Sequence, residues 1–151
     1  MSDFYVKVGD VVHFSKTVSE SDVYLFAGIT GDFAPNHVNH AVMEKSSYRQ
    51  RIAHGALMVG FMSTASTLSI AHVIHQDNLD DFPVSAGYDK VRFIKPVKFG
   101  DTITVHYLVA SVDRENGKSV AKVECKNQRN EVVAAAEHIM RWAKKLSVKA
   151  A

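Results

Sequence analysis

Alternating apolar and polar positions run through most of the second half of the chain. Four segments have this two-residue period: 84–96, 102–112, 119–126 and 131–142. Such a period is typical of strands with one buried face. The Asn116-Gly117 pair falls between the second and third segments, where it suits a tight hairpin. Strands joined by short turns lie side by side in opposite directions, so the pattern predicts an antiparallel sheet.

The first part of the chain predicts one more strand and two short helices. Residues 11–18 alternate loosely and are rich in β-branched side chains, which indicates a strand. Ser19 is a suitable N-cap for a following helix, and glycines at 28 and 31 end it. We expect a loop over 32–39, because Pro35 restricts its own backbone and that of the residue before it. A second short helix or turn is expected at 41–47.

A long uncharged segment lies between these two parts. Residues 55–76 contain no aspartate, glutamate, lysine or arginine, and their apolar side chains fall on every side of a helical wheel. A helix of this kind is usually buried on all sides. A membrane span of about 20 apolar residues is the alternative, but glycine, serine, threonine and histidine dilute the segment. The pattern therefore predicts an α+β fold in which an antiparallel sheet curls around a long central helix.

Composition narrows the class of protein. The chain of 151 residues fits a single domain, residues 1–151, and 46% hydrophobic with 23% charged residues is ordinary for a globular protein. A net charge of +2 and the lack of basic runs interleaved with aromatics argue against nucleic acid. We expect no nucleic-acid or membrane partner. The basic residues near the end are expected to be solvated: Arg141, Lys144, Lys145 and Lys149.

Cysteine usage points to a compartment. The single cysteine, Cys125, excludes an intrachain disulfide and fits a reducing environment. It lies in an alternating run, so a strand position is expected rather than a nucleophile. No basic region followed by an apolar stretch opens the chain, so no secretory signal is visible. These features favour a cytoplasmic protein.

A carboxylate and an imidazole lie five positions apart in the loop that contains Pro35. Asp32 and His37 are residue types that exchange protons near neutral pH. In a tight loop both reach one water molecule, which they could activate before a proton returns to a neighbouring carbon. The alternative is structural: Asp32 caps a turn and His37 is an ordinary loop histidine.

Gly55 opens the uncharged helix and adds a second candidate group. Backbone N–H groups in the first turn of a helix have no intrahelical acceptor, and the helix dipole places positive charge behind them. A carbonyl oxygen held there would be stabilised as it gains negative charge. The alternative is that Gly55 and Gly60 allow close packing against the sheet. His54, directly before Gly55, is expected to anchor the start of the helix.

The eight histidines raise the question of a metal. Two pairs lie three residues apart, His37 with His40 and His72 with His75, but spacing fixes no third ligand. The metal motifs Cys-x-x-Cys and His-Glu-x-x-His do not occur, and neither does a glycine-rich phosphate loop. Ser63 lies outside the setting of a hydrolase nucleophile. We therefore expect no metal and no cofactor.

These residues together resemble the MaoC-like, R-specific enoyl-CoA hydratases of the hot-dog fold. The resemblance is carried by Phe26-Ala27, Gly31-Asp32, Pro35, His37 and Ile52-Ala53-His54-Gly55, with a weaker match from Tyr88 to Asp101. It implies a homodimer that binds an acyl-CoA thioester near the interface. The implied reaction is syn addition of water to a trans-2-enoyl-CoA, giving an R-3-hydroxyacyl-CoA, or the reverse dehydration.

The resemblance also implies roles for four residues. Asp32 and His37 fall where the family's catalytic pair lies, and Gly55 falls where a backbone N–H holds the thioester oxygen. Ser63 falls on a helix position that helps order the active-site loop. One departure stands out, because the family commonly has Asn-Pro-x-His where this chain has Ala34-Pro35-Asn36-His37. Loop hydrogen bonding is expected to differ.

Two other functions fit the same fold. One is an acyl-CoA thioesterase, although many of these use a carboxylate on the central helix, and this helix has none. The other is a non-catalytic acyl-thioester binding protein. The sequence fixes neither the acyl chain nor its carrier, coenzyme A or acyl carrier protein. Candidates for the acyl pocket or the core are Phe33, Met43, Met58 and Met62, and candidates for phosphate contacts or solvated charges are Arg92, Lys95 and Lys98.

Overall fold

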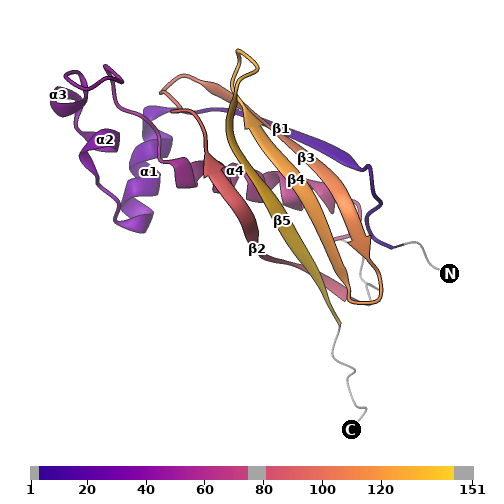
Figure 1. Ribbon diagram of the computed structural model, residues 1–151. Coiled ribbons are helices and arrows are strands. Elements are labelled where there is room, and N and C mark those ends of the chain that lie inside the picture. The colour runs from indigo at the N-terminus through magenta and orange to yellow at the C-terminus, as the bar shows by residue number, and fades with distance from the viewer. Residues whose placement is uncertain (1–3, 75–80, 145–151) are drawn as a thin grey trace, which may run out of the picture.

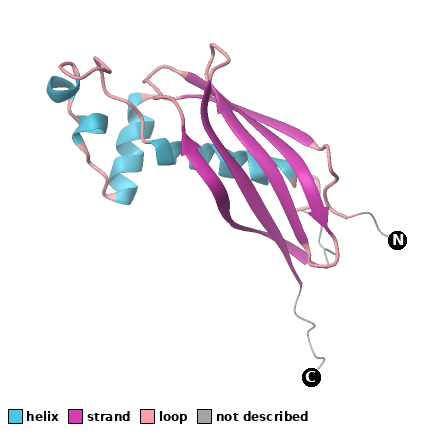
Figure 2. Ribbon diagram, in the orientation of Figure 1, coloured by secondary structure: helices cyan, strands magenta, loops and turns pink. Residues whose placement is uncertain are grey.

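The computed structural model describes residues 4–74 and 81–144 (Figure 1). In this part of the chain, a five-stranded antiparallel sheet of order β1-β3-β4-β5-β2 curls around helix α4 (Figure 2). The predicted α+β architecture is confirmed. The elements are β1 (Val11–Thr17), α1 (Glu20–Thr30), α2 (Pro35–Val38), α3 (His40–Met43), α4 (Gly55–Ser69), β2 (Asp81–Phe93), β3 (Thr102–Asp113), β4 (Lys118–Lys126) and β5 (Val132–Lys144).

Helix α1 begins and ends where its sequence signals lie. Ser19 Oγ accepts from the Asp22 N–H at 3.2 Å, and the Asp22 carboxylate accepts from the Ser19 N–H at 2.8 Å, which forms a capping box. Gly31 ends the helix at φ 81°, a left-handed conformation that favours glycine. This sharp end delivers Asp32 into the following loop.

The loop expected at 32–39 is partly helical, so that prediction was wrong in part. Pro35 is the first residue of α2, where its missing N–H would have had no helical partner and its fixed φ suits a helix. Asn39 then caps α3 by accepting from the Val42 N–H at 3.1 Å. Helices α1, α2 and α3 gather beyond one end of the sheet (Figure 1).

Helix α4 is shorter and less enclosed than the sequence predicts. It ends at Ser69, and residues 75 and 76 of the expected helix lie outside the described residues. One face packs against the sheet through Met58, Phe61, Met62, Ala65, Ser66 and Ser69. The opposite face is exposed in the single chain, so burial on all sides was wrong; it carries Ala56, Gly60, Ser63, Thr64, Thr67 and Leu68. Among the described residues, no helix is long and apolar enough to cross a membrane.

The sheet buries alternate side chains against α4. On β3 the buried residues are Ile103, Val105, Tyr107 and Val109, as the two-residue period predicts. Cys125 is fully buried on β4, and burial raises the pKa of its thiol to about 12. The expected strand position is confirmed, and a thiol with this pKa is not a ready nucleophile.

One histidine lies inside this core. His138 on β5 is fully buried between the Tyr107 hydroxyl, 2.7 Å from Nδ1, and Ser85 Oγ, 2.8 Å from Nε2. Burial lowers the pKa of His138 to about 4, because the charged form loses its hydration. The ring is therefore neutral at physiological pH, and its two hydrogen bonds satisfy both nitrogens.

Candidate active site

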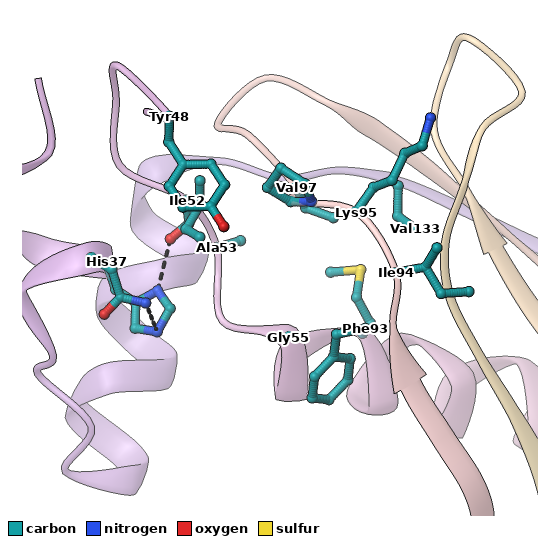
Figure 3. Close-up of a pocket in the computed structure, with 13 residues that line it drawn as sticks. His37, Tyr48, Ile52, Ala53, Gly55, Phe93, Ile94, Lys95, Val97 and Val133 are labelled. Atoms are coloured by element: carbon teal, nitrogen blue, oxygen red, sulfur yellow. Dashed lines mark hydrogen bonds between the residues drawn. The ribbon is translucent and has the colours of Figure 1, made fainter. Parts of the chain in front are cut away.

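His37 is buried and tied to the segment that precedes α4. Its Nδ1 lies 2.8 Å from the backbone oxygen of Ile52 (Figure 3). The Ile52 N–H in turn donates to the backbone oxygen of Asn36 at 3.0 Å. These reciprocal contacts join α2 to residues 51–54. A carbonyl can only accept, so Nδ1 must carry the hydrogen and the neutral ring keeps its lone pair on Nε2.

His54 links the same segment to the aspartate. Its ring stacks on His37 with 3.7 Å between centroids and 27° between planes. Nε2–H of His54 donates to the backbone oxygen of Asp32 at 2.9 Å. The Phe26 ring is tilted against that of His54, 4.7 Å away between centroids. These contacts match the anchoring role expected of His54.

Asp32 brings its carboxylate to this cluster from the partly exposed loop after α1. Its Oδ1 accepts from the Ala34 N–H at 3.2 Å, and Oδ2 lies 3.9 Å from Nε2 of His54. Asp32, His37 and His54 each offer a nitrogen or oxygen atom within 4.8 Å of the other two. A water molecule with hydrogen bonds of about 2.8 Å can bridge groups at this separation. The structure brings Asp32 and His37 together.

Two imidazoles and a carboxylate are also a set of metal ligands. Two such rings bind one ion when their in-plane lone pairs converge on it, whereas His37 and His54 are stacked with their planes 27° apart. The His54 nitrogen that faces the Asp32 carboxylate, Nε2, carries the hydrogen that it donates to a backbone oxygen, so it has no free lone pair for a metal. This geometry suits proton transfer better than ligation.

The two histidine pairs considered as metal ligands from their spacing include His40 and His72, and each of these contacts a group outside its pair. His40 lies 3.7 Å from the Glu44 carboxylate, and Nε2 of His72 lies 2.9 Å from the backbone oxygen of Tyr5. His75 lies outside the described residues.

Gly55 is the first residue of α4 and lies under an aromatic ring. A Cβ built on Gly55 would be 2.5 Å from Cδ2 of Phe93, so a side chain here would displace that ring. The close-packing alternative is therefore confirmed for Gly55. It was wrong for Gly60, which is exposed and where an added Cβ would meet no atom within 4 Å. The Gly55 N–H is compatible with this packing as a donor to a thioester oxygen, because first-turn amides have no intrahelical acceptor. This role stays a prediction.

A cavity of about 330 Å³ adjoins His37 and Gly55 (Figure 3). Most of its lining residues are apolar, and the polar ones are Asn36, His37, Tyr48 and Lys95. Its lining consists of Asn36, His37, Tyr48, Ile52, Ala53, Gly55, Met58, Phe93, Ile94, Lys95, Pro96, Val97 and Val133. A concave, mostly apolar site with a few convergent polar groups is typical of small-molecule binding.

The structure does not bring Ser63 to this group. It lies eight residues after Gly55, which is about 12 Å along a helix, on the exposed face of α4. Neither Ser63 nor Asp32 belongs to the cavity lining. In the described chain Ser63 offers its backbone oxygen to the Ser66 and Thr67 hydroxyls.

Of the acyl-pocket candidates, the structure places Met58 in the cavity wall. Met43 and Met62 are buried elsewhere, and the Phe33 side chain is 58% exposed. Met62 is therefore a core residue, and Phe33 lies at the surface.

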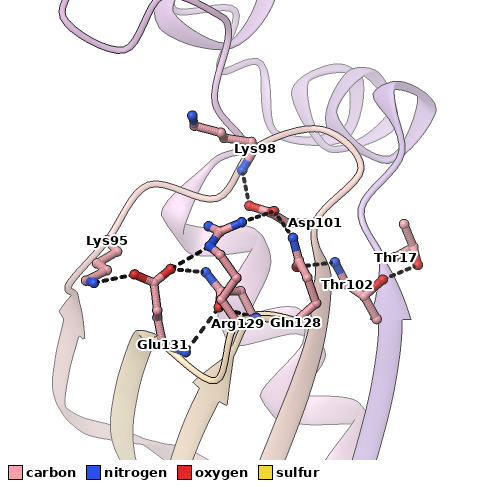
Figure 4. A network of polar contacts seen from close by, with 9 residues as sticks. Thr17, Lys95, Lys98, Asp101, Thr102, Gln128, Arg129 and Glu131 are labelled. Carbon is pink, nitrogen blue, oxygen red and sulfur yellow. Dashed lines mark hydrogen bonds and ion pairs between the residues drawn. The ribbon is translucent and has the colours of Figure 1, made fainter.

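A polar network fixes the loop that forms the far wall (Figure 4). The buried Asp101 carboxylate accepts from the Lys98 N–H at 2.8 Å and from Gln128 Nε2 at 2.7 Å. Glu131 accepts from Lys95 and Arg129, and hydrogen bonds from Asn127, Lys95 and Arg129 lower its pKa to about 2. The Lys95 side chain is thus hydrogen-bonded to Glu131 and points away from His37 (Figure 3).

Sequence reasoning missed Arg51, Asn36 and Phe93. Arg51 donates to the Tyr24 hydroxyl at 2.7 Å and pairs with Glu20, so it holds α1 against the segment before α4. Asn36 donates to Nε2 of His37 from 3.2 Å, with Nδ1–H of His37 fixed as above. Only the departure at 34–36 pointed to Asn36. Phe93 lies within the weaker family match but was given no role, and no local pattern marked Arg51.

A sheet curled around one helix defines a hot-dog protein, and in this one a carboxylate and an imidazole lie before the helix N-terminus. A family model described as "MaoC like domain" matches residues 4–133. The (R)-specific enoyl-CoA hydratase of Rhodospirillum rubrum is 32% identical over 124 residues, which cover 80% of this chain and 77% of that protein. The 3-hydroxybutyryl-CoA dehydratase of Methylorubrum extorquens is 28% identical, over 93% of this chain and 83% of its own length.

Solved structures agree with the sequence relatives. The R-hydratase PhaJ1 from Pseudomonas aeruginosa, in its unliganded form, matches with a TM-score of 0.76 at 28% identity. The match covers 97% of this chain and 88% of PhaJ1. The chain therefore belongs to the MaoC-like domain family, whose relatives named here are hydratases and dehydratases.

Proposed function

We propose that this protein is an R-specific enoyl-CoA hydratase, which adds water to a trans-2-enoyl thioester or removes it from the 3-hydroxyacyl thioester. The observation that carries the proposal is the approach of Asp32 and His37 within 4.8 Å. Gly55 begins a helix beside the same cavity. The named relatives act in this chemistry, which supports the same assignment here.

The mechanism follows from the hydrogen-bonding roles of these groups. Water donates one hydrogen to the Asp32 carboxylate and the other to the bare Nε2 of His37. The oxygen attacks C3 as the pair takes a proton, and a proton returns to C2 on the same face. The atoms of one water are thereby added across the double bond. The Gly55 N–H stabilises the negative charge that develops on the thioester oxygen.

Turnover of defined thioesters tests this proposal. Purified protein should remove the enoyl-thioester absorbance of crotonyl-CoA or a longer analogue, and chiral analysis should give the R product. A panel of chain lengths, each presented on coenzyme A and on acyl carrier protein, identifies the substrate. Release of free thiol would instead indicate a thioesterase. Tight binding without turnover in either direction would indicate a non-catalytic binding protein.

We propose that the protein uses no metal or other cofactor, and the stacked His37 and His54 rings support this. Activity should survive prolonged treatment with a chelator such as EDTA. Loss of activity that added zinc or manganese restores would contradict the proposal.

A cytoplasmic location is also proposed, because the lone Cys125 is buried as a free thiol.

A homodimer is proposed from surfaces that the single chain leaves uncovered. Strand β2 forms one edge of the described sheet, and Phe82 and Val84 on it are each 51% exposed. An unpaired edge with apolar side chains is a template for pairing with another strand. The exposed face of α4 carries small residues and Leu68, which is 43% exposed. Sedimentation at micromolar concentration should give twice the monomer mass.

A further inference from the structure

Asn36 contacts the acid/base pair at the nitrogen that the reaction needs. Its Nδ2 lies 3.2 Å from Nε2 of His37, and it lines the cavity. The Nδ1–H of His37 donates to Ile52, so Nε2 carries the lone pair. Nδ2 can only donate. Asn36 therefore occupies the same lone pair that would receive a hydrogen from water.

The backbone holds Asn36 in this place while its carboxamide can turn. The Ile52 N–H donates to the backbone oxygen of Asn36 at 3.0 Å. The terminal torsion of an asparagine side chain has broad, roughly two-fold preferences. A half-turn replaces the NH₂ group by Oδ1 at nearly the same position. One side chain can therefore donate to Nε2 or accept from it.

The other described groups shown to lie against the His37 ring, Asp32 and His54, do not offer both roles. The Asp32 carboxylate lies within 4.8 Å and can only accept when ionised. His54 is stacked on the ring and its Nε2–H donates to Asp32, so it gives Nε2 of His37 no hydrogen bond. Tyr48 also lines the cavity and its hydroxyl can donate or accept, but among the described residues the side chain hydrogen-bonded to Nε2 of His37 is that of Asn36.

We propose that Asn36 is a positioning residue for His37 that serves both protonation states of the ring. In the empty protein its NH₂ group donates to the bare Nε2. Water binding displaces that group. When a proton passes from water to Nε2, Oδ1 of the turned carboxamide accepts Nε2–H until the proton reaches C2. Asn36 itself gains and loses no atom: one water O–H bond and the C2–C3 π bond break, and the C3–O and C2–H bonds form. This role rests on the proposed hydratase function.

Nitrogen NMR of the free protein tests the contact without any substrate. With ¹⁵N-labelled histidine at pH 8, the Nε2 resonance of His37 should shift in Asn36→Leu toward that of a lone pair without a donor. Asn116→Leu, which removes a side-chain amide in the β3–β4 turn, is the matched control and should leave it in place. Identical Nε2 resonances in wild type and Asn36→Leu would overturn the proposal.

Kinetics then test the role in turnover. Asn36→Leu should lower kcat about three- to tenfold, the worth of one hydrogen bond, with KM changed by less than about twofold. Asn36→Asp is nearly isosteric but cannot donate when ionised, and its charge favours a proton on the ring. It should move the acidic limb of the kcat/KM profile to higher pH, which loss of packing alone would not do.

The outcomes separate this role from the proposed function. An active protein in which both Asn36 variants keep the wild-type kcat and pH profile would remove the role of Asn36 and leave the hydratase assignment. A protein that shows the NMR shift but turns over no enoyl thioester would remove both the hydratase assignment and the role of Asn36 in turnover.

Discussion

His37 is prepared for proton transfer by its neighbours rather than by its place in the sequence. The oxygen of Ile52 sets the tautomer, and the stacked ring of His54 sets the plane. Asp32 and His37 could be predicted because a carboxylate and an imidazole in one tight loop are chemically distinctive. The tautomer and the stack could not, because both depend on a segment some fifteen residues later that folds back against α2.

His54→Phe should lower turnover while leaving the fold intact. Phenylalanine keeps a ring against His37 but removes the N–H that donates to the backbone oxygen of Asp32. Losing this hydrogen bond and the position of Asp32 should reduce kcat by about tenfold. Steady-state kinetics with thermal melting measure the two effects. His54→Phe with wild-type kcat would show that the anchor is dispensable.

Gly55→Ala should destabilise the protein, and the loss should be smaller when Phe93 is also replaced by alanine. The new Cβ would lie 2.5 Å from the Phe93 ring, and overpacking of this kind costs about 1–3 kcal/mol. In Gly55→Ala/Phe93→Ala the clash is gone, while the backbone N–H of residue 55 is kept. Urea unfolding should therefore show less loss from Gly55→Ala when Phe93 is already Ala. Equal losses in both backgrounds would contradict the packing seen here.

Four of the five described strands follow closely from the two-residue period, whereas β2 lies three residues earlier than the expected segment 84–96 and two helices depart from prediction. β3 and β4 agree with expected bounds to one residue, because a curled sheet buries one face of each strand. α2 was missed because Pro35 was interpreted as a loop former and not as the first helical residue. α4 was predicted too long because absence of charge does not mark a helix end.

The buried His138 should make the sheet core sensitive to acid. Its pKa falls from 6.5 to about 4 on folding, so the unfolded chain binds the proton more tightly. The contribution of His138 to the free energy of unfolding is complete above about pH 6.5. It falls by about 3 kcal/mol as the pH drops toward 4. Urea unfolding between pH 7.5 and 4.5 measures the slope. His138→Leu should have a shallower slope, and an equal slope in both proteins would contradict the assignment.

The uncovered surfaces of the whole molecule could not be assigned from one chain's hydrophobic pattern. A helix with apolar side chains on every side is predicted to be buried, but the pattern does not say whether the covering surface comes from the same chain. In α4 the covered half meets this chain's sheet, and the other half is exposed. We interpret the exposed half, together with the β2 edge, as the surface of the proposed dimer.

Val84→Lys should weaken that dimer. A lysine on the β2 edge places a charge in an apolar contact, and edge lysines oppose strand pairing. Val11 on β1, the other edge of the described sheet, is 54% exposed and provides a matched control as Val11→Lys. Analytical ultracentrifugation should show a higher dissociation constant for Val84→Lys alone. An effect of equal size in both variants would argue against β2 as the interface.

The central claim is that Asp32 and His37 act together on one water. The direct measurement is kcat/KM for hydration by Asp32→Asn, His37→Ala and the double variant, each checked for native circular dichroism. Each single variant should lose at least about a hundredfold, and the double variant should lose little more, because groups that act as a unit are not additive. Single variants within tenfold of wild type, or losses that multiply in the double variant, would contradict the claim.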